Sequence, residues 1–518
     1  MVEKAGVKLS SRTHPLYDEN LSDWELYKAA VKGGESFINS NNLFSHRLED
    51  ATDYDERLER AYYLNFCEAI PSIYNSYIFK ERIERAPDPL LEQFRANVDR
   101  RGTSISEFVA RIGFFSKVYG AMHVLIDMPT TKTENPKITR RYAKENNIYP
   151  YCSLIYPEQL VDWSLDEDGN FRWVIIKSTY YLDEDPSVER QEKDHYKLIT
   201  PKEWRIVDED DNPAELSEGI PNSGPNKLGF VPIITLYHRD LDNDKIGESI
   251  LKDVVYVNRA ILNWCSCIDE QIERQTFSQL IVPDDGSLGE ASETGDDPLR
   301  RIGTSSAWTF PADATNPPQF ISPSTQSIET VWNLVVDHIK EIFRISGLIG
   351  SSEDLYVSRS GRAAQMGFLG VNSALAETAK RYQQFENEIS SVAYTQLGKD
   401  PSTFEEVKYP DSFDLGTLED EIDAFFKVME RNFSKRLNKT IMKDISRRAV
   451  PLAPQSIRKE IEDEIESSDG IVKSVMVEAR EAGSKEGQDG NPNTDNMQDS
   501  FRTKGKTKKE ESQHRTEE

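Results

Sequence analysis

The sequence predicts an α+β fold that is mainly helical. Three observations lead to this prediction. Long stretches repeat apolar residues every three or four positions, which is typical of helices with one buried face. Residues 149–240 instead hold short apolar runs between turn residues, which is typical of strands. The chain has 518 residues, too many for one simple core, so we expect two to four structural units.

The composition favours a soluble protein. Charged residues make up 30% of the chain, and no run approaches the roughly 18 to 20 apolar residues of a membrane span. Residues 1–28 show no apolar segment of a secretory signal, and four scattered cysteines favour a reducing compartment. The net charge of −27 agrees with simple solubility. It agrees equally with a surface past which DNA slides without sticking, because tight binding to phosphates needs basic residues.

Residues 22–119 are predicted to be mostly helical. Apolar residues recur at helical spacing in "YYLNFCEAIPSIYNSYI", and Pro71 is expected to kink or divide that helix. A later helix is expected to begin at a serine cap, Ser104 or Ser106, and to end at Gly120. The run "AMHVLIDMP" then predicts a short buried strand.

Residues 149–240 predict a β-rich unit. Two strands are expected on either side of "DEDGN", where Asp-Gly supplies the turn. "HYKLITPKEWRIVDED" predicts another strand pair, and "FVPIITLYHRD" a further strand. We interpret the acidic cluster at residues 208–212 as a solvated turn and not as a catalytic carboxylate pair.

Two long amphipathic helices, residues 246–276 and 327–349, are predicted around a small insertion. Residues 278–326 predict two or three short strands and a loop rich in Gly, Ser and Asp. Each helix has one apolar stripe with charged flanks. The stripes include Val254, Val257, Ile261 and Trp264 on the first helix, and Val331, Val335 and Ile339 on the second.

The segment "GSSEDLYVSRS", residues 350–360, predicts a loop. A long helix follows it, for which Ser360 is the expected cap. "TFEEVKYPDSFDLGTLE" predicts one strand, and two or three helices are expected as far as about residue 480. Residues 481–518 lack apolar periodicity, which predicts a disordered tail.

The motifs of common enzymes are not found in the sequence. It holds no G-x-x-x-x-G-K-[ST] phosphate loop, no H-E-x-x-H, and no G-x-S-x-G around Ser360. The seven histidines do not cluster, and Cys265 and Cys267 have no second cysteine pair with which to bind zinc. A triad assembled from distant residues stays open. We interpret the chain as a structural protein that is not an enzyme and needs no metal or other cofactor.

The order of the predicted elements resembles that of the portal proteins of tailed bacteriophages. "NKLGFVPIITLYHRD" is similar to the strand before their first stem helix, and "SILKDVVYVNRAILNWCSCIDEQIERQTFSQLIV" is similar to that helix. "FRISGLIG" and "SRSGRAAQMGF" resemble their returning helix and the junction after it. "VKYPDSF" and "LNKTIMKDISRRAVP" resemble their late strand and the helices that follow. The resemblance covers roughly residues 50–470 and rests on order and spacing.

The resemblance implies a ring subunit with wing, stem, clip and crown regions. Mapped onto this sequence, these are an N-terminal wing at 1–245, a stem helix at 246–277, a clip at 278–326, a returning stem helix at 327–349, a tunnel loop at 350–360, the long wing helix and strand at 361–425, crown helices at 426–480 and the tail at 481–518.

The resemblance also implies a function and partners. Such proteins form a ring, usually of twelve subunits, at one capsid vertex, and double-stranded DNA is packaged and ejected through its channel. The implied partners are further copies of the chain, the terminase large subunit, a head–tail connector or adaptor protein, the major capsid protein and a scaffolding protein. The implied location is the virion, with assembly in the bacterial cytoplasm and no membrane partner.

Site residues follow from the same resemblance. The tunnel loop would touch DNA weakly and transiently, since its Glu353 and Asp354 oppose tight binding. Its expected DNA-facing residues are Ser351, Ser352, Ser358, Arg359 and Ser360. Arg300, Arg301 and Trp308 are the expected docking residues of the clip, because Arg and Trp dominate interface energetics. The stem stripes would pack on each other and on neighbouring subunits.

Purely structural interpretations of these residues, and other functions for the chain, stay open. Residues 350–360 would also suit an ordinary exposed linker, and Trp308 would suit the clip's own small core. For the whole chain the alternatives are a minor capsid or scaffold-type protein without a channel, and a metal-dependent nuclease that uses scattered carboxylates.

Overall fold

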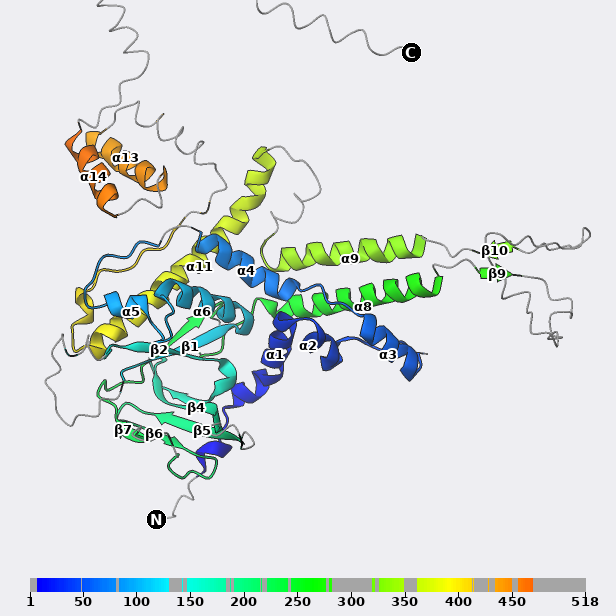
Figure 1. Ribbon diagram of the computed structural model, residues 1–518, viewed down its shortest axis with the longest axis horizontal. Coiled ribbons are helices and arrows are strands. Elements are labelled where there is room, and N and C mark those ends of the chain that lie inside the picture. The colour runs from blue at the N-terminus through cyan, green and yellow to red at the C-terminus, as the bar shows by residue number, and fades with distance from the viewer. Residues whose placement is uncertain are drawn as a thin grey trace, which may run out of the picture. The chain divides into compact units, whose positions relative to one another are not determined.

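The computed structural model divides the chain into two compact units, Met1–Asp414 and Leu415–Glu518, and each is described by itself. The described residues are 7–47, 49–80, 83–129, 142, 147–182, 187, 191–214, 216, 221–240, 244–275, 279–281, 319–321, 326–348, 361–411, 413, 427, 434–449 and 455–468. The first unit combines helices with antiparallel sheets, as expected for an α+β fold (Figure 1).

Helices dominate the first third of the chain. They are α1 (Pro15–Lys32), α2 (Glu35–Phe37), α3 (Ala51–Arg60), α4 (Phe66–Ile78), α5 (Glu92–Ala96) and α6 (Ile105–Tyr119). Short helical turns occur at Leu9–Ser11, Ile38–Asn42, Pro157–Gln159 and Pro401–Thr403.

The helical stretch does not divide at Pro71, because α4 runs through this residue. The break lies earlier, between α3 and α4, where Ala61 is extended. The side chain of Asn65 then caps α4 by accepting a hydrogen bond of 3.0 Å from the Glu68 amide. A good cap starts the new helix, and the position of the proline therefore does not mark its boundary.

Helix α6 has the predicted ends. Ser104 and Glu107 form a reciprocal capping box, which settles the choice between the two candidate serines. Gly120 ends the helix with a φ of 89°, a conformation that favours glycine. The chain then enters β1 (Ala121–Asp127), the predicted buried strand.

Strand β1 is the centre of a three-stranded antiparallel sheet. Its neighbours are β2 (Tyr151–Ile155) and β8 (Ile233–Tyr237), and His123 lies opposite both Ile155 and Thr235. Helix α6 packs against β1, and the later helix α11 (Gly361–Gln396) packs against β8. This sheet and its helices share one hydrophobic core with the N-terminal helices.

A second sheet follows the order β3-β4-β5-β6-β7 and is antiparallel throughout. Its strands are β3 (Leu160–Leu165), β4 (Phe171–Leu182), β5 (Gln191–Ile199), β6 (Glu203–Val207) and β7 (Ser223–Pro225). The predicted turn at "DEDGN" joins β3 to β4, and Asp166 closes it by accepting from the amide of Asn170 at 2.7 Å. Asp208 closes the acidic turn in the same way, which confirms that cluster as an exposed turn.

Helices α8 (Leu251–Gln275) and α9 (Gln326–Ile345) lie side by side and run in opposite directions (Figure 1). We call them the helix pair. In sequence they enclose β9 (Gln279–Ile281) and β10 (Gln319–Ile321), which pair with each other antiparallel. Helix α8 starts later than predicted, because the Ser249 hydroxyl accepts from the Leu251 amide at 2.9 Å and so defines the first turn.

The strand predicted in "TFEEVKYPDSF" is not formed within the described residues. Lys408 makes only an isolated bridge with Glu84. Side chains of α11 bind the neighbouring backbone instead: Asn387 accepts from the Val407 amide at 2.8 Å, and Gln383 accepts from the Tyr409 amide at 3.0 Å. A helix therefore satisfies the amides that a partner strand would have used.

The second unit contains α13 (Lys435–Ala449) and α14 (Gln455–Ser467), in agreement with the helices predicted there. Lys443 joins them through a 2.6 Å ion pair with Glu466. The predicted tail at 481–518 lies outside the described residues. Among the helices that the structure describes, none combines the length and the apolar character needed to cross a membrane.

Candidate functional site

The apolar stripes of the helix pair face each other. Val254, Ile261 and Val335 are buried, while Val257, Val331 and Ile339 are partly buried against the core. Trp264 differs from them, because this residue is 38% exposed in the single chain. The stripes therefore serve the packing of α8 on α9, and Trp264 projects beside that contact.

The helix pair keeps several large apolar side chains exposed. Trp332 and Leu334 of α9 are 48% and 38% exposed, although they flank the buried Val335. Successive helical residues are about 100° apart, which places Trp332 and Leu334 on opposite edges of the buried stripe. Tyr256, Trp264 and Ile272 of α8 are also exposed. The pair thus carries uncovered apolar surface on both edges of α9 and along α8.

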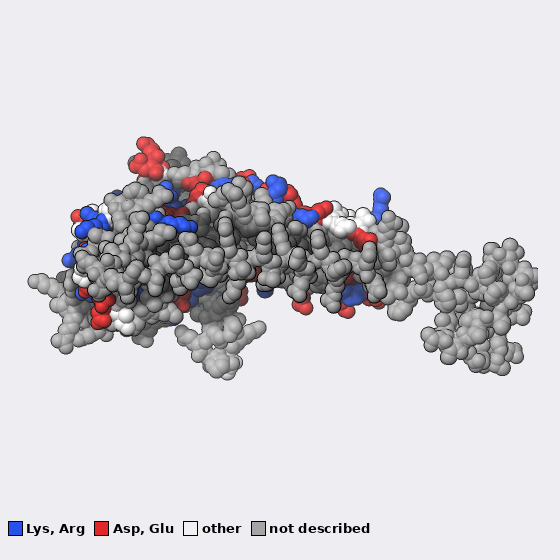
Figure 2. All heavy atoms as spheres, turned by 90° about the horizontal axis from the view of Figure 1, so that it is seen from above, with Lys and Arg blue, Asp and Glu red and all other residues white. Residues whose placement is uncertain are grey.

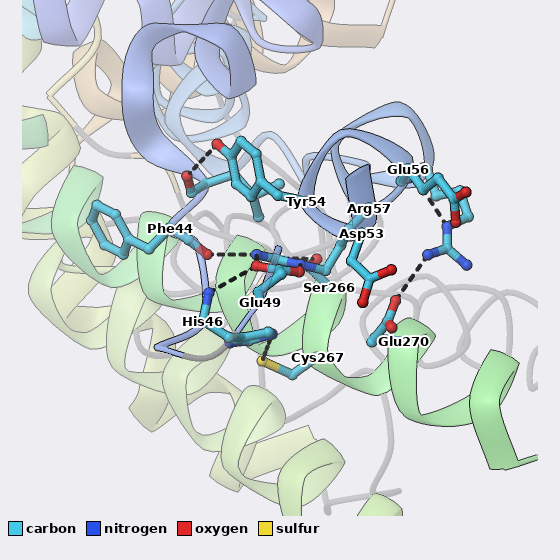
Figure 3. Close-up of polar contacts among 12 residues, drawn as sticks. Phe44, His46, Glu49, Asp53, Tyr54, Glu56, Arg57, Ser266, Cys267 and Glu270 are labelled. Carbon is cyan, nitrogen blue, oxygen red and sulfur yellow. Dashed lines mark hydrogen bonds and ion pairs between the residues drawn. The ribbon is translucent and has the colours of Figure 1, made fainter. Parts of the chain in front are cut away.

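A buried polar network fastens the N-terminal helices to α8 (Figure 3). Its centre is Arg57 of α3, which forms two hydrogen bonds of 2.7 Å with the two carboxylate oxygens of Glu49. The same guanidinium donates to the carbonyl of Phe44 at 2.7 Å and to the hydroxyl of Ser266 on α8 at 3.0 Å. The Arg57 hydrogen bonds lower the pKa of Glu49 to about 2. The pair is therefore charged at neutral pH.

Further contacts run along the same face of α8. Asn263 accepts from the Phe44 amide and donates to the Asn42 carbonyl, both at 2.9 Å. Arg60 forms a 2.8 Å ion pair with Glu270, one turn beyond Ser266. Positions 263, 266 and 270 share a helix face because residues three or four apart lie above one another. This face of α8 is thus dedicated to holding the segment 42–60.

An open pocket of about 700 Å³ lies beside this network. Its carboxylates already have partners: Glu49 binds Arg57, and Asp50 caps α3 by accepting from the Asp53 amide at 2.9 Å. Among the described residues, no group of three or more His, Cys, Asp or Glu is placed to hold a metal ion. The pocket is lined by Asn41, Leu43, Phe44, Ser45, Glu49, Asp50, Ala51 and Tyr54.

One wall of the pocket continues into an exposed cation–aromatic stack. The guanidinium carbon of Arg259 lies 5.3 Å from the ring centre of Phe44 and 5.0 Å from that of Tyr256. Phe44 and Tyr256 are 53% and 47% exposed. Tyr and Arg are the residue types that dominate binding energy at protein interfaces. The arrangement therefore suits recognition of another surface better than chemical catalysis.

The remaining predicted site residues lie outside the described residues. These are the loop residues Ser351, Ser352, Ser358, Arg359 and Ser360, and the insertion residues Arg300, Arg301 and Trp308. Sequence reasoning missed Glu49, Arg57 and Ser266. The available signal was the pair of uncharged polar residues Asn263 and Ser266 beside the apolar stripe of the amphipathic helix α8, because buried polar side chains need partners.

Neither the search of protein-family models nor the search of curated proteins found a match to this chain.

Proposed function

We propose that this protein is the portal subunit of a tailed bacteriophage, a structural protein that forms a ring at one capsid vertex. One observation carries the proposal: a rigidly fastened antiparallel helix pair whose apolar side chains remain exposed on both edges of α9. The order of elements in the sequence, described above, supports the same function.

A cyclic ring needs two different complementary surfaces on each subunit, one for each neighbour. Trp332 and Leu334 lie on opposite edges of the buried stripe, so each edge of α9 offers an apolar anchor. A two-fold dimer would need only one such patch. The exposed edges are therefore better explained by neighbours on both sides than by a single partner.

Rigid attachment supports the same proposal. A helix that lines a channel must keep its place while the channel's contents move. The bidentate contact between Arg57 and Glu49, the Ser266 hydroxyl and the two Asn263 hydrogen bonds together fix α8 to the N-terminal helices. Bidentate guanidinium–carboxylate pairs add geometric specificity as well as energy.

The charge balance agrees with a conduit for DNA. The chain carries a net charge of −27, and Figure 2 shows acidic and basic side chains interspersed on the face in view. Such a surface releases few counterions from a polyanion, so contacts stay weak and renewable. Under this proposal the segment 350–360 contacts the DNA and the insertion 278–326 docks terminase and the connector protein. The major capsid protein and a scaffolding protein are the other partners under this proposal.

The decisive test is the mass of the full-length protein by light scattering, combined with negative-stain imaging. We expect rings for the wild type and dissociated, folded subunits for Trp332→Asp and for Leu334→Asp. Asn333→Asp is the matched control, since Asn333 lies between the two and is exposed on the outer side of α9. A monomeric wild type would overturn the ring and would favour a structural protein without a channel. Rings that persist in both apolar variants would overturn the interface.

A further inference from the structure

The helix pair meets the rest of its unit at a buried joint built around Lys117. We define the joint as Tyr74 of α4, Lys117 of α6, the segment 247–251, Ser346 and Tyr382 of α11. These residues come from five parts of the chain that are far apart in sequence. The joint is therefore the place where both helices of the pair are anchored.

The backbone of Lys117 holds the start of α8. Its carbonyl accepts from the Ile250 amide at 3.0 Å and from the Ser249 hydroxyl at 3.2 Å. The same hydroxyl donates to the Val118 carbonyl at 2.6 Å. Helix α8 thus begins directly on the last turn of α6.

The side chain of Lys117 reaches the residues that hold the end of α9. Its ammonium group lies 5.5 Å from the ring centre of Tyr74. The Tyr74 hydroxyl donates to the carbonyl of Ser346, just beyond α9, at 2.8 Å. Lys117 therefore touches one anchor of the helix pair through its backbone and a second through its side chain.

The Lys117 side chain is fully buried and forms hydrogen bonds with uncharged groups. It donates to the hydroxyl of Tyr382 and to the Gly113 carbonyl, and its ammonium lies 4.7 Å from the Tyr382 ring centre. Among the described residues no carboxylate forms an ion pair with it. The Tyr382 hydroxyl in turn donates to Asn75 at 3.0 Å. Neutral acceptors and two aromatic faces stabilise an ammonium only partly, because charge burial without a counterion is costly.

The other ionisable groups that face Lys117 do not supply that counterion. From α11, Arg381 repels the ammonium and is itself paired with Glu377. After β8, Arg239 is paired with Glu248 at 3.0 Å, and burial lowers the pKa of His238 to about 3, so this ring is neutral. Burial raises the pKa of Tyr74 to about 12 and that of Tyr382 further, so both phenols stay neutral.

We propose that Lys117 makes this joint a proton-operated hinge, in which the closed form favours the neutral amine and the open form favours the protonated one. Opening exposes the side chain to water and frees the start of α8 and the end of α9. The proposal concerns each single chain, so it holds or fails independently of ring formation.

The direction of the pH effect follows from linkage. Burial lowers the pKa of Lys117 from its ordinary value of 10.5 to about 7. Between these two values the open joint binds more protons than the closed joint, so closing becomes more favourable as the pH rises. Below about 7 both states are protonated, and the dependence levels off.

Hydrogen exchange measured by mass spectrometry on the full chain tests the hinge. The quantity is the protection factor, which is the exchange rate of an unstructured amide divided by the observed rate at the same pH. For peptides that cover 247–255 we expect this factor to rise about tenfold per pH unit between about pH 7.5 and about pH 9. Peptides from β4 should show a much smaller change, since β4 is held by its ladders with β3 and β5.

Two variants separate Lys117 from other causes. Lys117→Met keeps the length of the side chain without its charge, so the protection of 247–255 should become independent of pH. Lys252→Met is the control: Lys252 is exposed at the start of α8, and Glu248 raises its pKa, so it does not titrate in this window. A pH dependence that persists in Lys117→Met overturns the proposal. A wild-type protection factor at 247–255 that does not change with pH also overturns it, as does a change of equal size in β4. Both of these results come from the wild type alone, so they do not depend on whether the variants fold.

Discussion

Arg57 and Glu49 form a bidentate ion pair whose side chains are only 3% and 4% exposed, at the point where α3 meets α8. Ser266 and the Phe44 carbonyl complete the hydrogen bonds of the guanidinium. Removing one member of such a pair leaves a buried charge without a partner, which is why it destabilises far more than the loss of a surface ion pair.

We predict that Arg57→Ala lowers the free energy of unfolding by about 3–5 kcal/mol. Arg60→Ala is the control, because Arg60 is 35% exposed and its ion pairs with Glu270 and Glu273 are partly solvated, so their loss should cost only about 1 kcal/mol. Urea unfolding followed by circular dichroism measures both. If the two variants unfold at the same urea concentration, the buried pair does not anchor α3 as described.

The same pair predicts a pH dependence. The folded-state pKa of Glu49 is about 2, below its ordinary value of 4.5, so the pair contributes fully above pH 4.5. The contribution is lost as the pH falls from 4.5 towards 2, because the unfolded state then binds the proton first. In Glu49→Gln we expect a shallower fall in melting temperature over this range than in the wild type. Parallel curves for the two proteins would contradict the assignment.

Close packing of Gly113 in α6 against Tyr382 leaves no room for a larger side chain. A Cβ atom at this position would lie 2.3 Å from the hydroxyl of the fully buried Tyr382. Gly113→Ala should therefore destabilise the protein by about 1–3 kcal/mol through overpacking, although alanine is the better helix former. Gly224→Ala, whose Cβ would lie 3.2 Å from the edge of Trp204, should cost less. Thermal melting that ranks the two in the reverse order would show that Tyr382 moves aside freely.

A substitution of Trp264 can distinguish an effect on assembly from an effect on folding. This residue is 38% exposed in the single chain, so Trp264→Asp should keep the circular dichroism spectrum of the wild type. If rings form through the helix pair, the same change should yield monomers or disordered rings, because a charge buried without a partner at the interface costs several kcal/mol. Lys252→Asp, at another exposed position of α8, should leave the rings intact. The mass measured by light scattering distinguishes rings from monomers. Intact rings from Trp264→Asp would show that α8 does not form part of the subunit interface.

Much of the secondary structure could be predicted because its signals are local. Residues that are close in sequence determine the capping box at Ser104 and Glu107 and the turn closed by Asp166. The same is true of the apolar periods of α8 and α9. The strand expected near Lys408 failed because Asn387, about twenty residues earlier, satisfies the Val407 backbone.

The candidate site was much harder to predict. Arg57 meets Ser266, and Lys117 meets Tyr382, across more than two hundred residues of sequence. Hydrophobic spacing can show which face of a helix is buried, but it does not show what that face touches. The exposure of Trp264 was missed for the same reason, since the period of α8 assigned it to a stripe that α9 covers only in part.

The main chain at Gly120, the end of α6, passes very close to the main chain at Gly247 in the joint. This close approach limits how the sequence can vary. A Cβ on Gly120 would lie 1.9 Å from the Gly247 carbonyl oxygen, and a Cβ on Gly247 would lie 2.1 Å from that of Gly120. Each glycine meets the other's main chain, so no compensating side-chain change elsewhere can make room. In a saturation mutagenesis library these two positions should accept no other residue, and neither should rescue the other. Gly229, around which a Cβ would meet open space, should accept asparagine better than either of them, because asparagine tolerates a positive φ more often than other residues with a side chain.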